Sequence, residues 1–545
     1  MTETFTEIRP SDTLRADGVF ALGCAYHPFW TCLVALQLLG CSQLTAAQQG
    51  KSTCTKAGPY LRSAQTALVA NDSATALEKL GQAVEIDPNC PDAHLLLGLT
   101  QFQHGDVGKS IQHYQQALKL DHGSYSAHYD LALAYVKSKK LQLARQELEQ
   151  AVALDPKQPN AAYDLGVVLL ELGQPAAAIP HLRHAHAITP DRPDVSFNIV
   201  RAELEAGRFA EARQAAQHAP SHLTSDFQWN AAIGQEFFKH GQSKDALDYL
   251  RAANGIRPTD EIVRTQLATV YLASGQPEQV LDLIKDPKTA TDHYLRGSAF
   301  YQAHRFPEAD EESDTALGLD PENPKIMVLR VRLLQRAGQQ NAAVELAQKA
   351  TKLTPSWDQP FYLAGISYYF LRHYTEAHQS LARAFELNPK AATAVFMAAL
   401  ASANEGKPQV AERYLRRAIS LQPDNARFHC HLGILFMRQN EYAKAERPLK
   451  RASQLKPDYA LPHYELGKFW AYSNQWNEAR REFEAAITTD PGFTSAYYHL
   501  ARVYTRLGEN EKSQTTLANF RRLHKQETDD AAAVEDDAKG ESDLQ

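Results

Sequence analysis

Apolar residues recur along most of the chain as two short stripes followed by a proline. In Ser124–Pro156 the first stripe includes Leu131 and Tyr135, and the second includes Leu148 and Ala151. Each stripe has the three- and four-residue spacing of one face of an amphipathic helix. A polar residue or a glycine separates the stripes, and the proline ends the second because it cannot continue a helical hydrogen-bond ladder. The pattern predicts pairs of antiparallel helices.

The closing prolines show that this pattern repeats every 34 residues. They stand at Pro88, Pro156, Pro190, Pro258, Pro321, Pro355, Pro389, Pro423, Pro457 and Pro491. Two gaps of 68 residues each hold one more repeat, in which His122 or Thr224 replaces the proline. Self-similarity of this length predicts hairpins that stack on one another, because one hairpin cannot bury its own apolar face.

Two segments carry the pattern of a known family most clearly. They are "AYDLGVVLLELGQPAAAIPHLRHAHAITP" (162–190) and "PHYELGKFWAYSNQWNEARREFEAAITTDP" (462–491). Both resemble the tetratricopeptide repeat, and the resemblance extends over residues 55–525. It implies an all-α fold, a right-handed α-solenoid of about fourteen antiparallel helix hairpins with a 34-residue period. Residues 1–50 and 526–545 lie outside this array.

One repeat, 259–287, departs from the period. The interval from Pro258 to Pro321 is 63 residues, five fewer than two periods, because Asp286 and Pro287 arrive early and remove most of a second helix. Two interpretations stay open. The short repeat is a bend, a widened groove or a hinge, or it is a deletion that local repacking absorbs.

Composition and charge say little about the fold, but they limit the classes of partner that the protein can bind. The net charge of −7 comes from the last twenty residues, which hold eight acidic side chains and one lysine, so the array itself is nearly neutral. A neutral array gives no reason to expect nucleic-acid binding. Residues 526–545 are predicted to form a disordered acidic tail, which either is solvated or folds back onto a basic groove.

No segment outside the repeats is long enough for a catalytic domain. The stretch "GDVGKS" (105–110) lacks the first glycine of a phosphate-binding loop and follows a predicted helix instead of a strand. His181 and His184 share a helix face, but no nearby carboxylate or thiolate completes a metal site. We therefore predict a protein that is not an enzyme and needs no metal, no cofactor and no small-molecule substrate.

In tetratricopeptide arrays the first helices of successive hairpins line a concave groove, and the resemblance places three sets of side chains there. The aromatic set is Tyr129, Tyr163, Phe197, Tyr294, Tyr362, Tyr369, Phe396, Tyr464 and Tyr498. The basic set, in the C-terminal half, is Lys325, Arg332, Arg336, Arg427, Arg438, Lys468, Arg502 and Arg506. The N-terminal half is mixed, with Asp92, Lys137, Glu171, Asp194, Arg201, Glu205 and Lys239.

These sets imply protein partners that enter as peptides or helical segments. Guanidinium groups favour acidic segments, because they bind carboxylates through two hydrogen bonds at once. The aromatic rings have two interpretations, capture of partner side chains and packing between repeats.

The first 50 residues contain an apolar run that belongs to no repeat. Residues 18–50 carry no formal charge, and their apolar core at 19–40 suits an export signal or a retained anchor. Cys41, in "LLGC", is the candidate lipidation site, and Ala47 is the alternative signal cleavage site. Against export, Met1–Asp17 holds four acids and two arginines, whereas signals prefer a positive start. Membrane contact is expected only through this segment.

Cys54 and Cys90 bear on the cellular compartment. They precede the first helices of adjacent hairpins, where a disulfide is within reach, and a disulfide needs an oxidising compartment. Together with the apolar run, they predict a location in the cell envelope, periplasmic or lipid-anchored, with the cytoplasm as the alternative.

Two functions follow from this reasoning. The first is a non-catalytic scaffold of the cell envelope that binds partner segments in its concave groove. The alternative is a regulatory or carrier subunit of a secretion or polysaccharide-modifying enzyme complex, in the cytosol or at the membrane. Groove chemistry narrows the ligand only to a class and leaves the partner unnamed.

Overall fold

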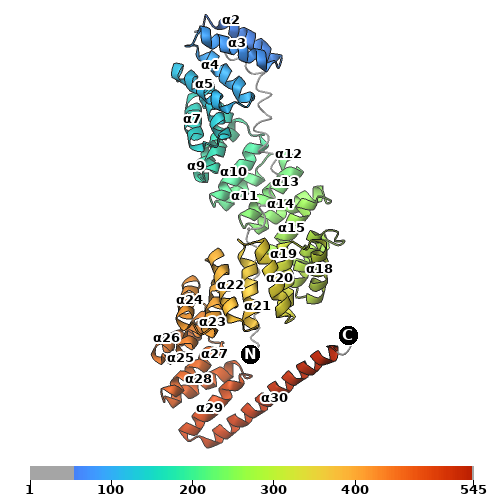
Figure 1. Cartoon of the computed structure of the whole chain (residues 1–545), viewed down its shortest axis with the longest axis vertical. Helices are drawn as coiled ribbons and strands as arrows, with labels where there is room; N and C mark the ends of the chain where they lie inside the picture. The colour runs from blue at the N-terminus through green and yellow to red at the C-terminus, as the bar shows by residue number, and fades with distance from the viewer. Residues whose placement is uncertain (1–53, 543–545) are drawn as a thin grey trace. The chain divides into compact units, whose positions relative to one another are not determined.

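The structure is a computed structural model, and it describes residues 54–542. These residues form helices joined by short turns, and no strand occurs among them. The chain divides into two compact units, Met1–Asp286 (unit 1) and Pro287–Gln545 (unit 2). In each unit the hairpins follow one another side by side in chain order (Figure 1).

Unit 1 holds seven hairpins among its described residues. Its helices are α2 (Gly58–Val69), α3 (Ser73–Ile86), α4 (Pro91–Gln103), α5 (Val107–Leu120), α6 (Tyr125–Lys137), α7 (Leu141–Leu154), α8 (Pro159–Glu171), α9 (Pro175–Ile188), α10 (Pro193–Glu205), α11 (Phe209–Gln217), the short α12 (Ser221–Thr224), α13 (Phe227–Lys239), α14 (Ser243–Ile256), α15 (Glu261–Ala273) and α16 (Pro277–Leu283).

Unit 2 also holds seven hairpins among its described residues. Its helices are α17 (Ala290–Gln302), α18 (Phe306–Leu319), α19 (Pro324–Arg336), α20 (Gln340–Leu353), α21 (Asp358–Phe370), α22 (Tyr374–Leu387), α23 (Ala392–Asn404), α24 (Pro408–Leu421), α25 (Ala426–Arg438), α26 (Tyr442–Leu455), α27 (Ala460–Tyr472), α28 (Trp476–Thr489), α29 (Thr494–Leu507) and α30 (Asn510–Ser542). The prediction of an all-α solenoid of fourteen hairpins is confirmed.

Several hairpins close on a contact between a glycine of the first helix and a large apolar residue of the second. In α8 a side chain at Gly166 would place its Cβ 2.6 Å from Leu182 of α9, so only glycine fits there. Gly433 of α25 faces Leu449 of α26 in the same way. Both leucines are fully buried. The repeated glycine is therefore a packing requirement of the hairpin.

Histidines tie several hairpins to the loop that precedes them. His128 Nδ1 lies 2.7 Å from Glu147 on the second helix, and His128 Nε2 lies 3.2 Å from the backbone oxygen of His122. His293 and His463 make the same contact, at 2.7 Å, with the glutamates nineteen residues further on. These histidines have a structural role, as their recurrence at one repeat position indicates.

The boundary between the units falls within the short repeat 259–287. There α16 spans seven residues, whereas most other second helices span fourteen. Whether this repeat acts as a bend or hinge stays a prediction.

The C-terminal end differs from the expectation. The sequence predicts a hairpin that ends near residue 525 and a disordered tail over 526–545, but α30 continues as one helix to Ser542. The physical reason is that the segment contains four alanines, the residue with the highest intrinsic helix propensity, and no proline.

Candidate functional site

The first helices of the hairpins form the inner side of each unit. In unit 1 the first helices α4 and α6 contact each other directly, and in unit 2 so do α19 and α21 and also α25 and α27. The second helices of successive hairpins make fewer such contacts within the described residues. A stack whose first helices lie closer together is concave on their side. All aromatic and basic residues that the sequence singled out for the groove lie on these first helices.

Most rings of the aromatic set join one repeat to the next. Tyr129 donates a hydrogen bond to Asp164 at 2.7 Å, and Tyr163 accepts one from Asn198 at 3.1 Å. In unit 2, Tyr369 accepts one from Asn404 at 3.1 Å, and the Phe396 ring is 4% exposed. These contacts favour packing over capture of a partner.

The other rings of the set differ in exposure. Phe197, Tyr294, Tyr362 and Tyr464 are half-buried, and Tyr498 is 41% exposed beside Phe520 of α30. For Tyr498 a role in partner capture stays a prediction.

Several charged residues on the inner helices of unit 1 neutralise one another. Arg201 forms ion pairs with Glu205 at 2.8 Å and with Glu171 at 3.3 Å. Lys239 lies 3.7 Å from Glu236. Two cations of this region therefore have carboxylate partners on the same face, whereas Lys137 lies over the Phe102 ring.

Two carboxyl groups of unit 1 lie in poorly hydrated positions on this face. Removal from water raises the pKa of Asp130 to about 7. The same cause raises the pKa of Asp164 to about 6, although the hydrogen bond from Tyr129 acts in the opposite direction. Poor hydration disfavours the negative charge on both carboxyl groups, so this face also disfavours the charge of a bound anion.

In unit 2 five arginines of the first helices contact neutral groups instead of carboxylates, whereas Arg296 and Arg330 pair with Glu312 and Asp310. Arg332 donates to the Gln359 side chain at 3.0 Å, and Arg438 donates to the Asn404 side chain at 3.4 Å. Arg336 stacks over Phe306, Arg502 over Tyr498 and Arg506 over Trp476. None of these five arginines forms an ion pair with a carboxylate of any residue between 54 and 526. Lys468 differs, because it pairs with Glu465 at 2.8 Å.

Two histidines that the sequence reasoning did not assign to the groove share this face. Burial, followed by the nearby Arg427 and Arg438, lowers the pKa of His431 to about 4. Burial, followed by Lys468 and Arg502, lowers the pKa of His499 to about 4. Both rings are therefore neutral at pH 7. Their signal in the sequence is a histidine at the repeat position that holds aspartate in α6 and α8.

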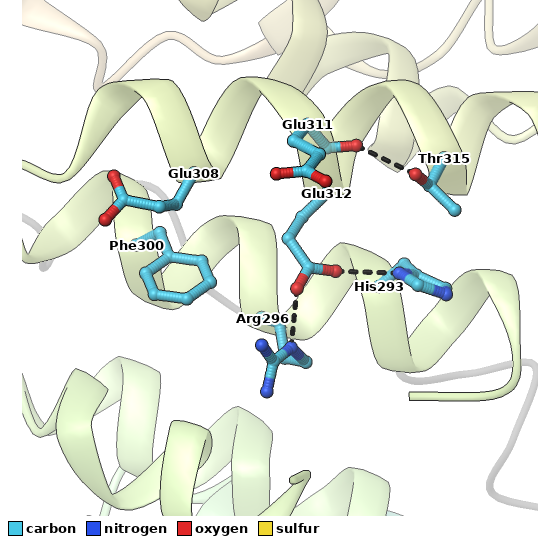
Figure 2. Close-up of a pocket in the computed structure, with 7 residues that line it drawn as sticks. All are labelled: His293, Arg296, Phe300, Glu308, Glu311, Glu312 and Thr315. Atoms are coloured by element: carbon cyan, nitrogen blue, oxygen red, sulfur yellow. Dashed lines mark hydrogen bonds and ion pairs between the residues drawn. The ribbon is translucent and has the colours of Figure 1, made fainter. Parts of the chain in front are cut away.

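A separate pocket lies on the first hairpin of unit 2, between α17 and α18 (Figure 2). Glu312 accepts a hydrogen bond from Arg296 at 2.6 Å and lies 2.7 Å from His293. Glu308 pairs with Arg305 outside this group, and Thr315 donates to the backbone of Glu311 at 2.9 Å.

Within this pocket Glu312, His293 and Arg296 satisfy one another. Sequence reasoning missed the pocket, although Arg296 occupies the repeat position at which α6 has Leu131. Among the described residues, no group of three or more side chains is arranged to hold a metal ion.

The N-terminal predictions fall largely outside the described residues. Cys41, Ala47 and the apolar core 19–40 all precede residue 54. Cys54 and Cys90 form a disulfide, with their Cα atoms 5.2 Å apart, and it ties the start of the described chain to the first turn of α4. Within the described part of the chain, no helix is long and apolar enough to cross a membrane.

Comparison with family models decides the identity of the repeats. A model of the tetratricopeptide repeat matches residues 362–411 and 396–460, and a second one matches 471–534. The chain is a tetratricopeptide-repeat protein. Residues 41–293 also match the model of the C-terminal domain of cilia and flagella-associated protein 70. A protein built of tetratricopeptide repeats is a protein-interaction scaffold, so its partners are proteins or peptides.

Individual relatives of this tetratricopeptide-repeat protein are distant. Cellulose synthase operon protein C of Pseudomonas fluorescens (strain SBW25) is 31% identical over 110 residues, which is 19% of this chain and 9% of that protein. The chain thus spans about a tenth of that relative's length.

Solved structures with a similar fold include the Cut9–Hcn1 hetero-tetramer of the APC/C, at 14% identity over 87% of this chain and 98% of that chain, with a TM-score of 0.41. YrrB, described as a TPR protein with an unusual peptide-binding site, is 21% identical over 34% of this chain and 97% of its own, with a TM-score of 0.31.

Proposed function

We propose that this protein is a non-catalytic scaffold whose inner helices in unit 2 bind acidic segments of partner proteins. The observation that carries the proposal is that Arg332, Arg336, Arg438, Arg502 and Arg506 share one face and form no ion pair with a described carboxylate. Guanidinium groups that hold only neutral contacts keep their capacity for two-pronged binding of a carboxylate.

The experiment compares capture of partners by the wild-type chain and by the triple variant Arg332→Ala, Arg438→Ala, Arg502→Ala. We expect the variant to lose most of the captured proteins, and the remaining capture to depend less on salt. The matched control is Arg417→Ala, Arg447→Ala, Arg481→Ala, which removes three exposed arginines from the second helices. Equal capture by the triple variant and the wild-type chain would overturn the proposal.

We place this scaffold in the cell envelope. The support is the uncharged run at 18–50 and the disulfide between Cys54 and Cys90, which persists in an oxidising compartment. Cell fractionation, with palmitate labelling of the wild-type chain and of Cys41→Ser, tests the location and the anchor. Cytosolic protein with both Cys54 and Cys90 as free thiols would contradict the envelope location.

A second candidate function is a regulatory or carrier subunit of a polysaccharide-modifying complex. The similarity to cellulose synthase operon protein C favours it over other complexes. Co-purification with a glycosyltransferase under native conditions is the expected result. Capture of partners without any carbohydrate-active enzyme would favour the general scaffold.

A further inference from the structure

One repeat position on the inner face of unit 2 changes character along the stack. Taken every 34 residues, it holds Arg332, Ile366, Leu400, Ile434, Lys468 and Arg502. These residues belong to α19, α21, α23, α25, α27 and α29, so they form one row across six neighbouring first helices. The row is basic at both ends and apolar in the middle.

Two of the three helices that carry the middle of the row, α21 and α23, contain no lysine or arginine. The segment of α23 contains no charged residue, and α21 contains only Asp358, at its first position. The three apolar residues of the row, Ile366, Leu400 and Ile434, are half-buried (the apolar strip). Beside the strip, Phe370 of α21 is 48% exposed.

The cations lie at the two ends of the apolar strip, and α25 carries both Ile434 of the strip and two arginines. Helix α19 holds Lys325, Arg332 and Arg336, whereas α25, α27 and α29 together hold Arg427, Arg438, Lys468, Arg502 and Arg506. The apolar surface and the arginine groups therefore occur in a fixed order along the face.

We propose that unit 2 binds a protein segment in which a short apolar run is flanked on both sides by acidic residues. This inference rests on the proposed function, and it adds the order of residues that the ligand must have. Apolar side chains of the ligand cover the apolar strip, because burial of exposed apolar surface is favourable. Carboxylates at both ends meet Arg332 on one side and Arg438 and Arg502 on the other.

The spacing of the helices sets the length of this segment. Packed helices lie about 8–10 Å apart, so three steps, roughly 24–30 Å, separate Arg332 on α19 from Arg438 on α25, and five steps, roughly 40–50 Å, separate it from Arg502 on α29. An extended chain advances about 3.3 Å per residue, so a segment of about eleven residues reaches from Arg332 past Arg438 toward Arg502. The apolar strip covers two of those steps, which correspond to about five ligand residues.

A nucleic acid fits this face less well than such a peptide. A nucleic-acid strand carries a negative charge at every step, and affinity for it comes from neutralising those charges continuously. Across α21 and α23 the face offers no cation to do so.

The test uses two synthetic peptides and the full chain. Both peptides contain eleven residues of identical composition. In the first, three acidic residues precede and three follow five leucine or isoleucine residues; in the second, acidic and apolar residues alternate. We expect the first peptide to bind at least ten-fold more tightly by fluorescence anisotropy. The variant Ile366→Gln, Leu400→Gln, Ile434→Gln should remove that preference.

The matched control for this variant is Leu319→Gln, Leu353→Gln, which changes two exposed leucines of the second helices. Circular dichroism verifies that each variant is folded, and the comparison of the two peptides on the wild-type chain needs no variant at all. Equal affinity for both peptides would overturn the inference while the proposed function stands. If neither acidic peptide binds, the proposed function and this inference are both refuted. Tighter binding of an eleven-nucleotide oligothymidine than of the first peptide would also overturn the inference.

Discussion

Unit 1 and unit 2 are built from the same repeat, but their inner helices carry opposite charge. In unit 1 the acidic residues of the first helices are Asp92, Asp130, Asp164, Glu171, Asp194, Glu203, Glu205, Glu236 and Glu261, and the basic ones are Arg62, Lys137, Arg201, Lys239 and Arg264. In unit 2 the acidic ones are Asp292, Asp358 and Glu465, and the basic ones are Arg296, Lys325, Arg330, Arg332, Arg336, Arg427, Arg438, Lys468, Arg502 and Arg506.

The pairing of these charges differs as well. In unit 1 Arg201 is held between Glu171 and Glu205, whereas in unit 2 Arg332 and Arg438 donate hydrogen bonds to amide side chains of neighbouring repeats. The buried leucines and alanines that hold the hairpins together are alike in the two units. The comparison teaches that in this repeat the core specifies the fold, and a few inner positions decide what the surface can bind.

The first and largest test of the comparison concerns the shared core. We expect Leu182→Ala in unit 1 and Leu449→Ala in unit 2 each to lower the free energy of unfolding by about 2–5 kcal/mol, because each leaves a cavity beside a glycine of the facing helix. Urea unfolding of the full chain, with hydrogen exchange to assign the affected unit, measures both. Costs that differ several-fold would show that the two cores are not equivalent.

The disulfide distinguishes the units, because Cys430, the remaining described cysteine, is buried and unbridged. We expect Cys90→Ser to destabilise the first hairpins of unit 1 by about 2–4 kcal/mol, since the unfolded chain gains freedom over a 36-residue separation. Faster hydrogen exchange in α2–α5 with unchanged exchange in α19–α29 is the expected pattern. A uniform change across both units would contradict it.

For the Asp130 carboxyl group of unit 1 we expect a contribution to stability that falls as pH rises. Loss of hydration raises the pKa of Asp130 to about 7 in the folded chain from 3.8. Between about pH 4 and pH 7 the folded state therefore binds more protons than the unfolded state, and stability declines with increasing pH. Between pH 4 and pH 7 we expect the free energy of unfolding to fall by about 2–4 kcal/mol less in Asp130→Asn than in the wild-type chain. Thermal unfolding of both chains from pH 4 to 8 measures the difference, and parallel curves would refute it.

For His431 of unit 2 we expect the opposite effect, a stability that falls as pH falls. Burial, with Arg427 and Arg438 nearby, lowers the pKa of His431 to about 4 from 6.5. The unfolded state binds more protons between about pH 6.5 and pH 4, so stability is lost as pH falls through that window. Between pH 7.5 and pH 4.5 we expect the free energy of unfolding to fall by about 1–3 kcal/mol less in His431→Gln than in the wild-type chain. Resonances of the His431 ring give an independent measurement, and a titration midpoint near 6.5 would argue against this account.

Sequence reasoning recovered the repeats well and the groove only in part. The 34-residue spacing of Pro355, Pro389 and Pro423 was enough to locate the hairpins, and the early Asp286 and Pro287 marked the repeat in which the units divide. The rings of Tyr129 and Tyr163 were assigned to the groove, but their hydroxyls reach residues 35 positions away in the next repeat. Side-chain contacts of this kind depend on how two hairpins stack, and spacing alone does not report them.

The sequence by itself determined the helix pairs, their period and the sign of charge on each first helix, because these follow from local periodicity and residue identity. Only the tertiary structure decided which charges cancel. Arg201 pairs with Glu171, which lies thirty residues earlier on the preceding first helix, whereas Arg332 donates to Gln359 of the next repeat. Both contacts depend on the packing of neighbouring repeats. Charge is a property of a residue, whereas neutralisation is a property of a pair of side chains that only the folded stack brings together.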